Sequence, residues 1–222
     1  MPGLLRAEGL SLTLEADDGR PHQVLDRVDL ELAGGTLTDI VGPSGSGKTM
    51  LLRALARLLP AATGTLSLDG KSAADYSPQE WRTEVALLPQ TASMRPGTVR
   101  ENLLLPWTLK VRHEVKPPDD AGLLGALAGV GIEDISLDRD AARLSVGQAA
   151  RISLLRVLMT RPRVLLLDEP DAALDEASSE QVAHAMLEFV ESGGAAARVR
   201  HRSSDGLASR RLRLHGGHIE EV

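Results

Sequence analysis

The stretch GPSGSGKT, Gly42–Thr49, decides the fold of this chain. It follows a strand-like segment, TLTDIV at 36–41, and it opens a segment with helical periodicity, KTMLLRALARLL at 48–59. Glycines let backbone N–H groups converge on phosphate oxygens, and the start of a helix adds partial positive charge. The stretch therefore predicts a loop that binds a polyphosphate between a buried strand and a helix.

Two side chains at the end of this loop carry the expected chemistry. Lys48 can bridge the β- and γ-phosphates of a nucleotide, and the hydroxyl of Thr49 can coordinate Mg²⁺. An accidental turn rich in glycine and serine is the alternative, and the position between a strand and a helix argues against it. The predicted phosphate-binding residues are Gly42, Pro43, Ser44, Gly45, Ser46, Gly47, Lys48, Thr49 and Met50.

A pair of acids lies further along, in VLLLDEP at 164–170. The apolar run before it is typical of a central parallel strand that is buried on both faces. We expect Asp168, at the tip of this strand, to hold Mg²⁺ through water, and Glu169 to polarise a water for attack on the γ-phosphate. For an isolated DEP sequence, two solvated acids would be the better interpretation, and the phosphate loop changes that. A GTPase is disfavoured because the guanine-reading N-K-x-D motif cannot occur: Asn102 is the only asparagine, and Leu103 follows it.

The rest of the chain alternates between strand-like and helix-like segments. Residues 4–41 predict strands, with LSLTLEA and VLDRVDLEL alternating around a turn at 17–19. SSEQVAHAMLEFVES predicts a helix that ends at the glycines 193 and 194. We therefore expect one α/β domain over 1–222, doubly wound, with an antiparallel β subdomain near its start. The core and β subdomain take 1–90 and 161–222, and an inserted helical subdomain takes 91–160.

Composition narrows the functional classes. The net charge of −6 and the pI near 5.5 argue against general binding to nucleic acid or to anionic lipid. The absence of cysteine excludes disulfides, thiol catalysis and cysteine-based zinc sites. No transition-metal site is expected from His113, His184, His215 and His218, whose spacing is not that of ligands. No secretion signal is visible, and the apolar segment 121–132 is shorter than the ~20 residues that span a bilayer. We expect a cytoplasmic chain whose membrane-spanning part, if it has one, belongs to a partner.

The order of these motifs resembles that of the ATP-binding subunit of an ABC transporter, over nearly the whole chain. GPSGSGKT resembles Walker A, VLLLDEP resembles Walker B, and AALD at 172–175 resembles the D-loop. Gln90 in LLPQ lies where the family has its Q-loop glutamine, LSVGQ at 144–148 lies where it has its LSGGQ signature, and His201 falls at the spacing of the switch histidine. Two segments, GTVRENLLLPWTLKVR and RISLLRVLMTRPRVLLLDE, are similar to the ATPase subunits of Fet-type iron exporters.

The resemblance implies a RecA-like P-loop core and an ATPase whose two copies enclose two MgATP molecules head to tail. It implies an integral-membrane permease docked near 90–107, a position on the cytoplasmic face of the membrane, and no nucleic-acid partner. Two other functions stay open: a non-catalytic or sluggish ATP-binding regulator, and a soluble ABC ATPase not tied to a membrane. The implied catalytic residues are Glu169, His201 and Gln90; the implied metal ligands are Thr49, Gln90 and Asp168; and the implied contacts from the second copy are Ser145, Gly147 and Gln148.

The signature segment departs from the family pattern at Val146, where the first glycine usually lies. Ser145 and Gln148 have the spacing of a capping box, which predicts that a helix begins here. The first turn of a helix requires αR dihedral angles, which valine tolerates at a modest propensity penalty. We therefore expect Val146 to hinder the nucleotide sterically and to slow turnover relative to glycine.

Other departures concern the nucleotide base and the strand before His201. The family usually places an aromatic ring in an early strand, and residues 12–14 contain none, which predicts weak discrimination between bases. Arg198 and Arg200 lie in a strand that is usually apolar, Arg202 replaces the usual acid after the histidine, and Asp39 is polar in the strand that enters the phosphate loop. Arginine is seldom fully buried unless it is paired.

Overall fold

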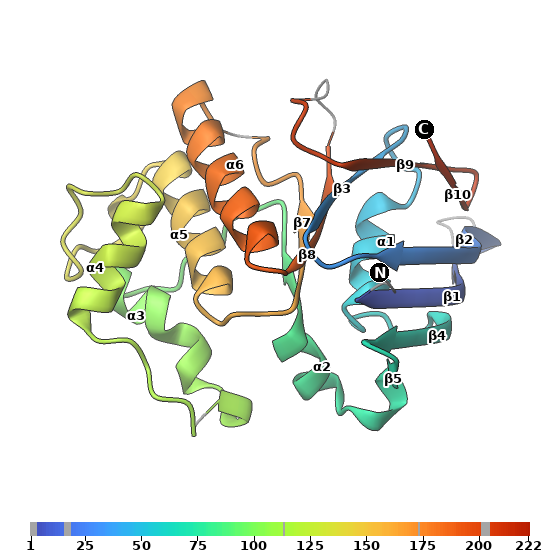
Figure 1. Cartoon of the computed structure of the whole chain (residues 1–222), viewed down its shortest axis with the longest axis horizontal. Helices are drawn as coiled ribbons and strands as arrows, with labels where there is room; N and C mark the ends of the chain where they lie inside the picture. The colour runs from blue at the N-terminus through green and yellow to red at the C-terminus, as the bar shows by residue number, and fades with distance from the viewer. Residues whose placement is uncertain (1–3, 16–18, 113, 173, 201–204) are drawn as a thin grey trace.

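The computed structural model describes residues 4–15, 19–112, 114–172, 174–200 and 205–222. Its central element is a six-stranded sheet in the order β10-β9-β3-β8-β7-β6 (Figure 1). The five strands from β9 to β6 run parallel to their neighbours, and β10 pairs antiparallel with β9. The strands are β3 Thr36–Val41, β6 Val85–Leu88, β7 Val164–Asp168, β8 Ala195–Val199, β9 Arg210–His215 and β10 His218–Glu221.

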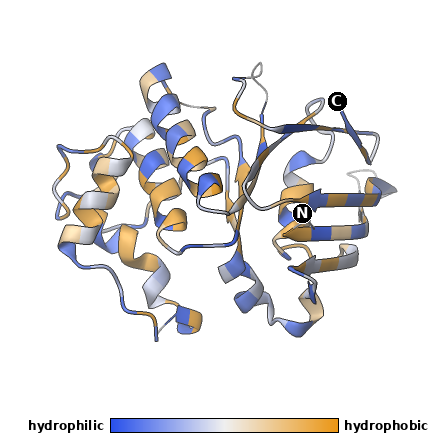
Figure 2. Cartoon of the chain, in the orientation of Figure 1, coloured by the Kyte–Doolittle hydropathy of each residue, from blue (hydrophilic) through white to orange (hydrophobic). Residues whose placement is uncertain are grey.

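A second sheet, in the order β2-β1-β4-β5, is antiparallel throughout. Apolar and polar residues largely alternate along β1 and β2, as Figure 2 shows, because successive side chains of a strand point to opposite faces. This sheet is the β subdomain that the alternating sequence predicts. Its strands are β1 Leu5–Glu15, β2 Pro21–Leu32, β4 Thr63–Leu68 and β5 Lys71–Ser72.

Helix α1, Lys48–Leu55, lies between the two sheets (Figure 1). Its Leu51 and Leu52 are fully buried in a cluster that also contains Leu12 of β1 and Leu166 of β7. Leu165 points to the other face of β7 and belongs to a second cluster, which the helical part of the chain completes. The central sheet is therefore covered on both faces, as a parallel sheet requires.

The helices between β6 and β8 form a layer on the side of the central sheet that faces away from α1 (Figure 1). Residues from α4, α5 and α6 contribute to the second cluster, whose members include Leu127, Ile152 and Val182. The fold is the predicted α/β P-loop arrangement with a helical insert, and the exact limits 91–160 stay a prediction. The helices are α2 Pro78–Glu84, α3 Val99–Leu104, α4 Asp120–Gly129, α5 Val146–Leu158 and α6 Glu176–Glu191, with short 3₁₀ turns η1 Ala73–Asp75, η2 Leu105–Thr108, η3 Lys110–Arg112 and η4 Ala141–Arg143. Among the described residues, no helix has the length and apolar character needed to cross a bilayer.

Two helix starts follow the capping chemistry of the sequence. The Ser145 hydroxyl accepts a hydrogen bond from the backbone N–H of Gln148, and the Gln148 side chain accepts one from the N–H of Ser145, which confirms the predicted capping box. Asp119 caps α4, because its side chain accepts a hydrogen bond from the backbone N–H of Gly122.

The helix that leaves the phosphate loop is shorter than the sequence predicts, because it ends at Leu55 rather than before Pro60. Arg57 has left-handed backbone angles, with φ of 52°, and so breaks the helical path. Its guanidinium donates to the carbonyl oxygens of Ala73 and Tyr76, at 2.5 and 2.9 Å, which fixes the turn against η1.

A buried ion pair joins two neighbouring strands of the central sheet. Asp39 of β3 and Arg198 of β8 are register partners and are 2% and 1% exposed. The Arg198 Nε atom donates to Asp39 Oδ1 at 2.6 Å, and its Nη2 donates to Asp205 Oδ1 at 2.7 Å. The two positions that look too polar in the sequence therefore neutralise each other inside the protein.

Candidate functional site

The phosphate loop depends on glycine at two points. Gly47 has left-handed backbone angles, with φ of 96°, immediately before α1. A Cβ there would lie 2.8 Å from Val24 Cγ1, and a Cβ on Gly42 would overlap the carbonyl oxygen of Leu214. The close packing of the loop against β2 and β9 therefore requires residues without a side chain at both positions.

Lys48 lies at the bottom of this loop. Its Nζ donates to the carbonyl oxygens of Gly42 and Pro43, at 2.9 and 2.8 Å. Burial lowers the pKa of Lys48, and the charges of Glu169 and Asp168 oppose that shift. The buried lysine can attract a polyphosphate, and the two acids near it can attract the metal ion that accompanies the phosphates.

Thr49 and Asp168 are far apart in the sequence and meet beside this lysine. The Thr49 hydroxyl oxygen lies 2.9 Å from Asp168 Oδ2 and 3.1 Å from Oδ1. Asp168 is buried as the last residue of β7, and Thr49 is the second residue of α1. Hydroxyl and carboxylate oxygens are the hard ligands that Mg²⁺ prefers, so this pair fits that ion.

Gln90 and Glu169 also meet, on the open side of the loop. The Gln90 Nε2 atom donates to Glu169 Oε2 at 3.0 Å. Glu169 directly follows β7 and has left-handed backbone angles, with φ of 51°, an uncommon conformation for a residue with a side chain. The two consecutive acids therefore have different partners: Asp168 accepts from Thr49, and Glu169 accepts from Gln90.

These residues surround a cavity of about 550 Å³. The volume falls within the range of ~300–1,000 Å³ found for small-molecule sites. Within this loop, Ser46 Oγ is buried and has no hydrogen-bond partner among the described residues, which suits a polar ligand. The described lining is His22, Val24, Ser44, Gly45, Ser46, Gly47, Lys48, Thr49, Met50, Gln90 and Glu169.

Sequence reasoning missed His22 and Val24, which β2 contributes to this cavity. Residues 12–14 of β1, where the family usually has an aromatic ring, contain none, and Leu14 of that strand is the register partner of His22. The available signal was the alternation of the two strands around a turn, which places 21–24 opposite 12–15. It does not fix the register closely enough to name the residue.

The signature residues lie elsewhere in the chain, at the start of α5. Ser145, Gly147 and Gln148 are not among the described residues that line the cavity. Val146 is the first residue of α5, lies outside the left-handed region and is 66% exposed. A single copy therefore presents this helix start to solvent, separately from its own phosphate loop.

Comparison with known proteins identifies the family. The profile of the ABC transporter family matches residues 25–172, which include the phosphate loop, Gln90, the signature segment and both acids. The chain belongs to the ABC transporter family. It is therefore an ABC ATPase domain, and the matched residues include the segments that resemble Walker A, Gly42–Thr49, and Walker B, 164–170.

Individual relatives of this ABC ATPase have different stated roles. It is 36% identical over 168 residues to the probable iron export ATP-binding protein FetA of Escherichia coli K12, covering 76% of this chain and 73% of FetA. It is 37% identical over 201 residues to the hemin import ATP-binding protein HmuV of Nocardia farcinica, covering 89% and 68% of the two chains. The dimeric post-hydrolysis structure of the ATP-binding cassette MJ0796, with ADP and phosphate, superposes with a TM-score of 0.85 at 23% identity, over 98% and 97% of the chains.

His201, the predicted switch histidine of this ABC ATPase, lies outside the described residues. The residue before it, Arg200, is buried and its Nη2 donates to Asp171 Oδ2 at 3.1 Å. Asp205, which follows the segment that is not described, pairs with both Arg200 and Arg198. These ion pairs connect the end of β8 to the segment that follows Walker B.

Proposed function

We propose that this ABC ATPase binds MgATP at Gly42–Met50 and uses Glu169 to activate the attacking water. The observation that carries the proposal is the convergence of Lys48, Thr49 and Asp168 with Gln90 and Glu169 around one cavity. Three separate segments of the chain supply these groups. Such an arrangement has the parts that phosphoryl transfer needs: a cradle, a cation, metal ligands and a base.

In the proposed mechanism, the residues mainly position groups and stabilise charge. Lys48 holds the β- and γ-phosphates through its charge, and the loop N–H groups orient them. The Gln90 amide orients the Glu169 carboxylate, which accepts a proton from the attacking water. When bound through Thr49, Gln90 and Asp168, Mg²⁺ supplies charge neutralisation at the phosphates.

The proposal includes a head-to-tail homodimer when ATP is bound. Ser145, Gly147 and Gln148 stand at an exposed helix start, outside the cavity of their own chain. A capped helix start attracts anions through its N–H groups, so it can cover the γ-phosphate held by a second copy. His201 is the remaining proposed contact to that phosphate.

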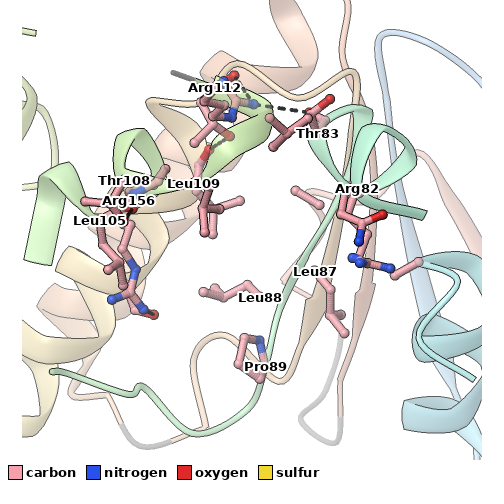
Figure 3. A pocket seen from close by; sticks show the side chains of 18 of the residues that line it. Arg82, Thr83, Leu87, Leu88, Pro89, Leu105, Thr108, Leu109, Arg112 and Arg156 are labelled. Carbon is pink, nitrogen blue, oxygen red and sulfur yellow. Dashed lines mark hydrogen bonds between the residues drawn. The ribbon is translucent and has the colours of Figure 1, made fainter. Parts of the chain in front are cut away.

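We further propose that the ATPase works on the cytoplasmic face of the membrane with an integral-membrane permease. The supporting feature is a second, larger cavity of about 660 Å³ (Figure 3), next to the segment 90–107 that the family resemblance assigns to docking. Nucleic acid is not proposed as a partner, because the chain carries a net charge of −6.

For the cargo we propose iron, moved out of the cell. The support is the likeness to FetA, since the ATPase site itself does not contact cargo. Deleting the gene should raise cellular iron, measured by mass spectrometry, and a copy carrying Glu169→Gln should not restore the wild-type content. Unchanged iron in the deletion strain would contradict this cargo.

The test of the catalytic assignment is Glu169→Gln. Removing a general base should slow ATP hydrolysis at least about 100-fold, because such groups contribute ~10²–10⁴. Nucleotide binding should persist, so an ATP-bound dimer should accumulate on size-exclusion chromatography. Glu191→Gln, at the exposed end of α6, is the matched control and should hydrolyse ATP normally. Wild-type turnover in Glu169→Gln would rule out Glu169 as the base.

A further inference from the structure

Arg200, the residue that follows β8, is anchored in the central sheet. Its backbone N–H donates to the carbonyl oxygen of Ile40, in β3, at 3.2 Å, so the contact between β3 and β8 continues one residue beyond β8. Its side chain is 7% exposed. The Nη2 atom donates to Asp171 Oδ2 at 3.1 Å, and Nη1 lies 2.5 Å from Asp205 Oδ2. Both the backbone and the guanidinium of Arg200 are therefore fixed in place.

Arg200 belongs to a network of buried charges. Arg198 pairs with Asp39 and Asp205, and Asp205 also pairs with Arg200. A planar guanidinium presents several N–H groups in fixed directions, so one arginine can orient two carboxylates at once. Asp171 is the member of the network that follows β7. Because the strand order is β3-β8-β7, the network reaches from β3 across β8 to the turn after β7.

That turn carries Glu169, whose backbone needs support. Glu169 has φ of 51°, a conformation that persists in a residue with a side chain only when the surroundings hold it. Within the turn, the N–H of Ala172 donates to the carbonyl oxygen of Glu169 at 3.3 Å. The N–H of Leu174 donates to the carbonyl oxygen of Asp171, also at 3.3 Å. Both bonds are longer than the usual length of about 2.9–3.0 Å, so they hold the turn only weakly.

We propose that Arg200, acting through Asp171, is a positioning residue for ATP hydrolysis. The ion pair ties the turn after β7 to the central sheet two residues from Glu169, and so keeps the Glu169 carboxylate at the cavity. Neither Arg200 nor Asp171 is among the described residues that line this 550 Å³ cavity, so the pair acts by position and not by contact. The inference rests on the proposed function, since it assumes that Glu169 is the base.

The first test is Asp171→Ala. Arg200 keeps Asp205 as its partner in this variant, so the chain should fold. Loss of the pair frees the turn, and kcat for ATP should fall about tenfold, because a misplacement of ~1 Å can lower a rate ~10²-fold. KM for ATP should stay within about twofold of wild type, since the phosphate loop is unchanged. Asp171→Asn keeps an oxygen that can accept from Nη2, so it should lose less activity than Asp171→Ala.

Asp39→Asn is the matched control for stability. It removes a charge from the same network at a more deeply buried position, 3% against 14% exposed, and leaves the Arg200–Asp171 pair in place. Its unfolding midpoint should fall at least as far as that of Asp171→Ala, whereas its kcat should stay within about twofold of wild type. A loss of kcat in Asp171→Ala alone would therefore report position and not stability.

A double-mutant cycle identifies the group through which the pair acts. In a Glu169→Gln chain the base is already absent, so adding Asp171→Ala should change the residual single-turnover rate by less than about twofold. The same change in the wild-type chain should give the full tenfold loss. Radiolabelled ATP makes the slow rates measurable.

Amide hydrogen exchange gives a readout that does not depend on catalysis. The ion pair restrains the turn, so in Asp171→Ala the protection factors of the Ala172 and Leu174 amides should fall about tenfold. Asp39→Asn should leave the ratio of these two factors to those of the other turns unchanged. Mass spectrometry of the nucleotide-free protein measures the exchange.

The outcomes separate this inference from the proposed function. Wild-type turnover in Glu169→Gln would overturn both together. Slow turnover in Glu169→Gln with a normal kcat in Asp171→Ala would overturn the inference alone. So would an equal loss from Asp171→Ala in both chains, because Asp171 would then act on a group other than Glu169.

Discussion

Val146 shows how one side chain can alter a family site without disturbing the fold. It begins α5 outside the left-handed region, so the helix tolerates it as the sequence predicts. The neighbouring Gly147 has less room for a side chain, because a Cβ there would lie 3.3 Å from Ser178 Oγ. The valine methyl groups face solvent in one copy and would face the nucleotide of a second copy in the proposed dimer.

Val146→Gly should therefore raise ATP turnover. Removing the branched side chain lets the helix start approach the phosphate, and we expect a gain of about two- to tenfold, equivalent to ~0.4–1.4 kcal/mol of barrier. Steady-state phosphate release measures it. Val146→Ala, which keeps one methyl group, should fall between valine and glycine. Equal or slower turnover in the glycine variant would show that the side chain does not hinder closure.

At the residue scale, the sequence predicted a loop between a strand and a helix at Gly42–Thr49 and an acid at the tip of a buried strand at Asp168, because both motifs are local. The spacing of the loop residues is fixed by one turn between a strand and a helix, so Lys48 and Thr49 can be named without a structure. His22 could not be named, because its place in the cavity depends on the register of β1 against β2. The roles of the predicted residues, and the weak base discrimination, stay predictions.

At the scale of elements, the pairing of β3 with β8 explains two residues that single-strand patterns cannot. Each strand, taken alone, contains a charge where a buried strand should be apolar. Their parallel register places Asp39 directly beside Arg198, and Asp205 provides a second carboxylate. Each charge looks anomalous in its own strand, and no local pattern connects two residues that are 159 positions apart.

The effects of replacing Asp39 and Arg198 on the free energy of unfolding should be strongly non-additive. Asp39→Val leaves Arg198 buried with only the partly exposed Asp205, and we expect a loss of about 3 kcal/mol in the free energy of unfolding. The double variant Asp39→Val with Arg198→Val should recover most of that loss, because an apolar pair needs no counter-charge. Urea unfolding of the single and double variants measures the coupling.

A surface pair provides the comparison for this experiment. Arg210 Nη2 and Glu221 Oε2 lie 2.9 Å apart, and the two side chains are 35% and 61% exposed. Glu221→Gln should therefore change the free energy of unfolding far less than Asp39→Val does, because solvent screens an exposed pair. If the losses from Asp39→Val and Arg198→Val simply add in the double variant, the buried pair contributes no coupling.

At the scale of the whole molecule, the sequence predicted the fold class and the β subdomain, but it did not predict the surfaces that several elements form together. Alternating and helical periodicities predicted both the α/β core and the β subdomain, and the structure confirms these. The 660 Å³ cavity was not predicted as a shape, because α2, η2 and α5 come together only in the folded chain. Local patterns specify elements, whereas grooves depend on long-range packing.

The proposed dimer predicts complementation between two inactive variants. Lys48→Ala disables the phosphate loop, and Ser145→Arg disables the signature helix, so each should be nearly inactive alone. In a mixed dimer, the intact loop of one chain faces the intact helix of the other. An equal mixture should recover about a quarter of wild-type turnover, since half the dimers are mixed and each has one working site. No recovery would indicate that each chain completes its own site.

The embedded Asp39–Arg198 pair also has an evolutionary consequence. A lineage that gains either charge alone strands it in the interior and loses stability, so the path between an apolar sheet and this one passes through a weakened ancestor. Living descendants should therefore carry both charges or neither.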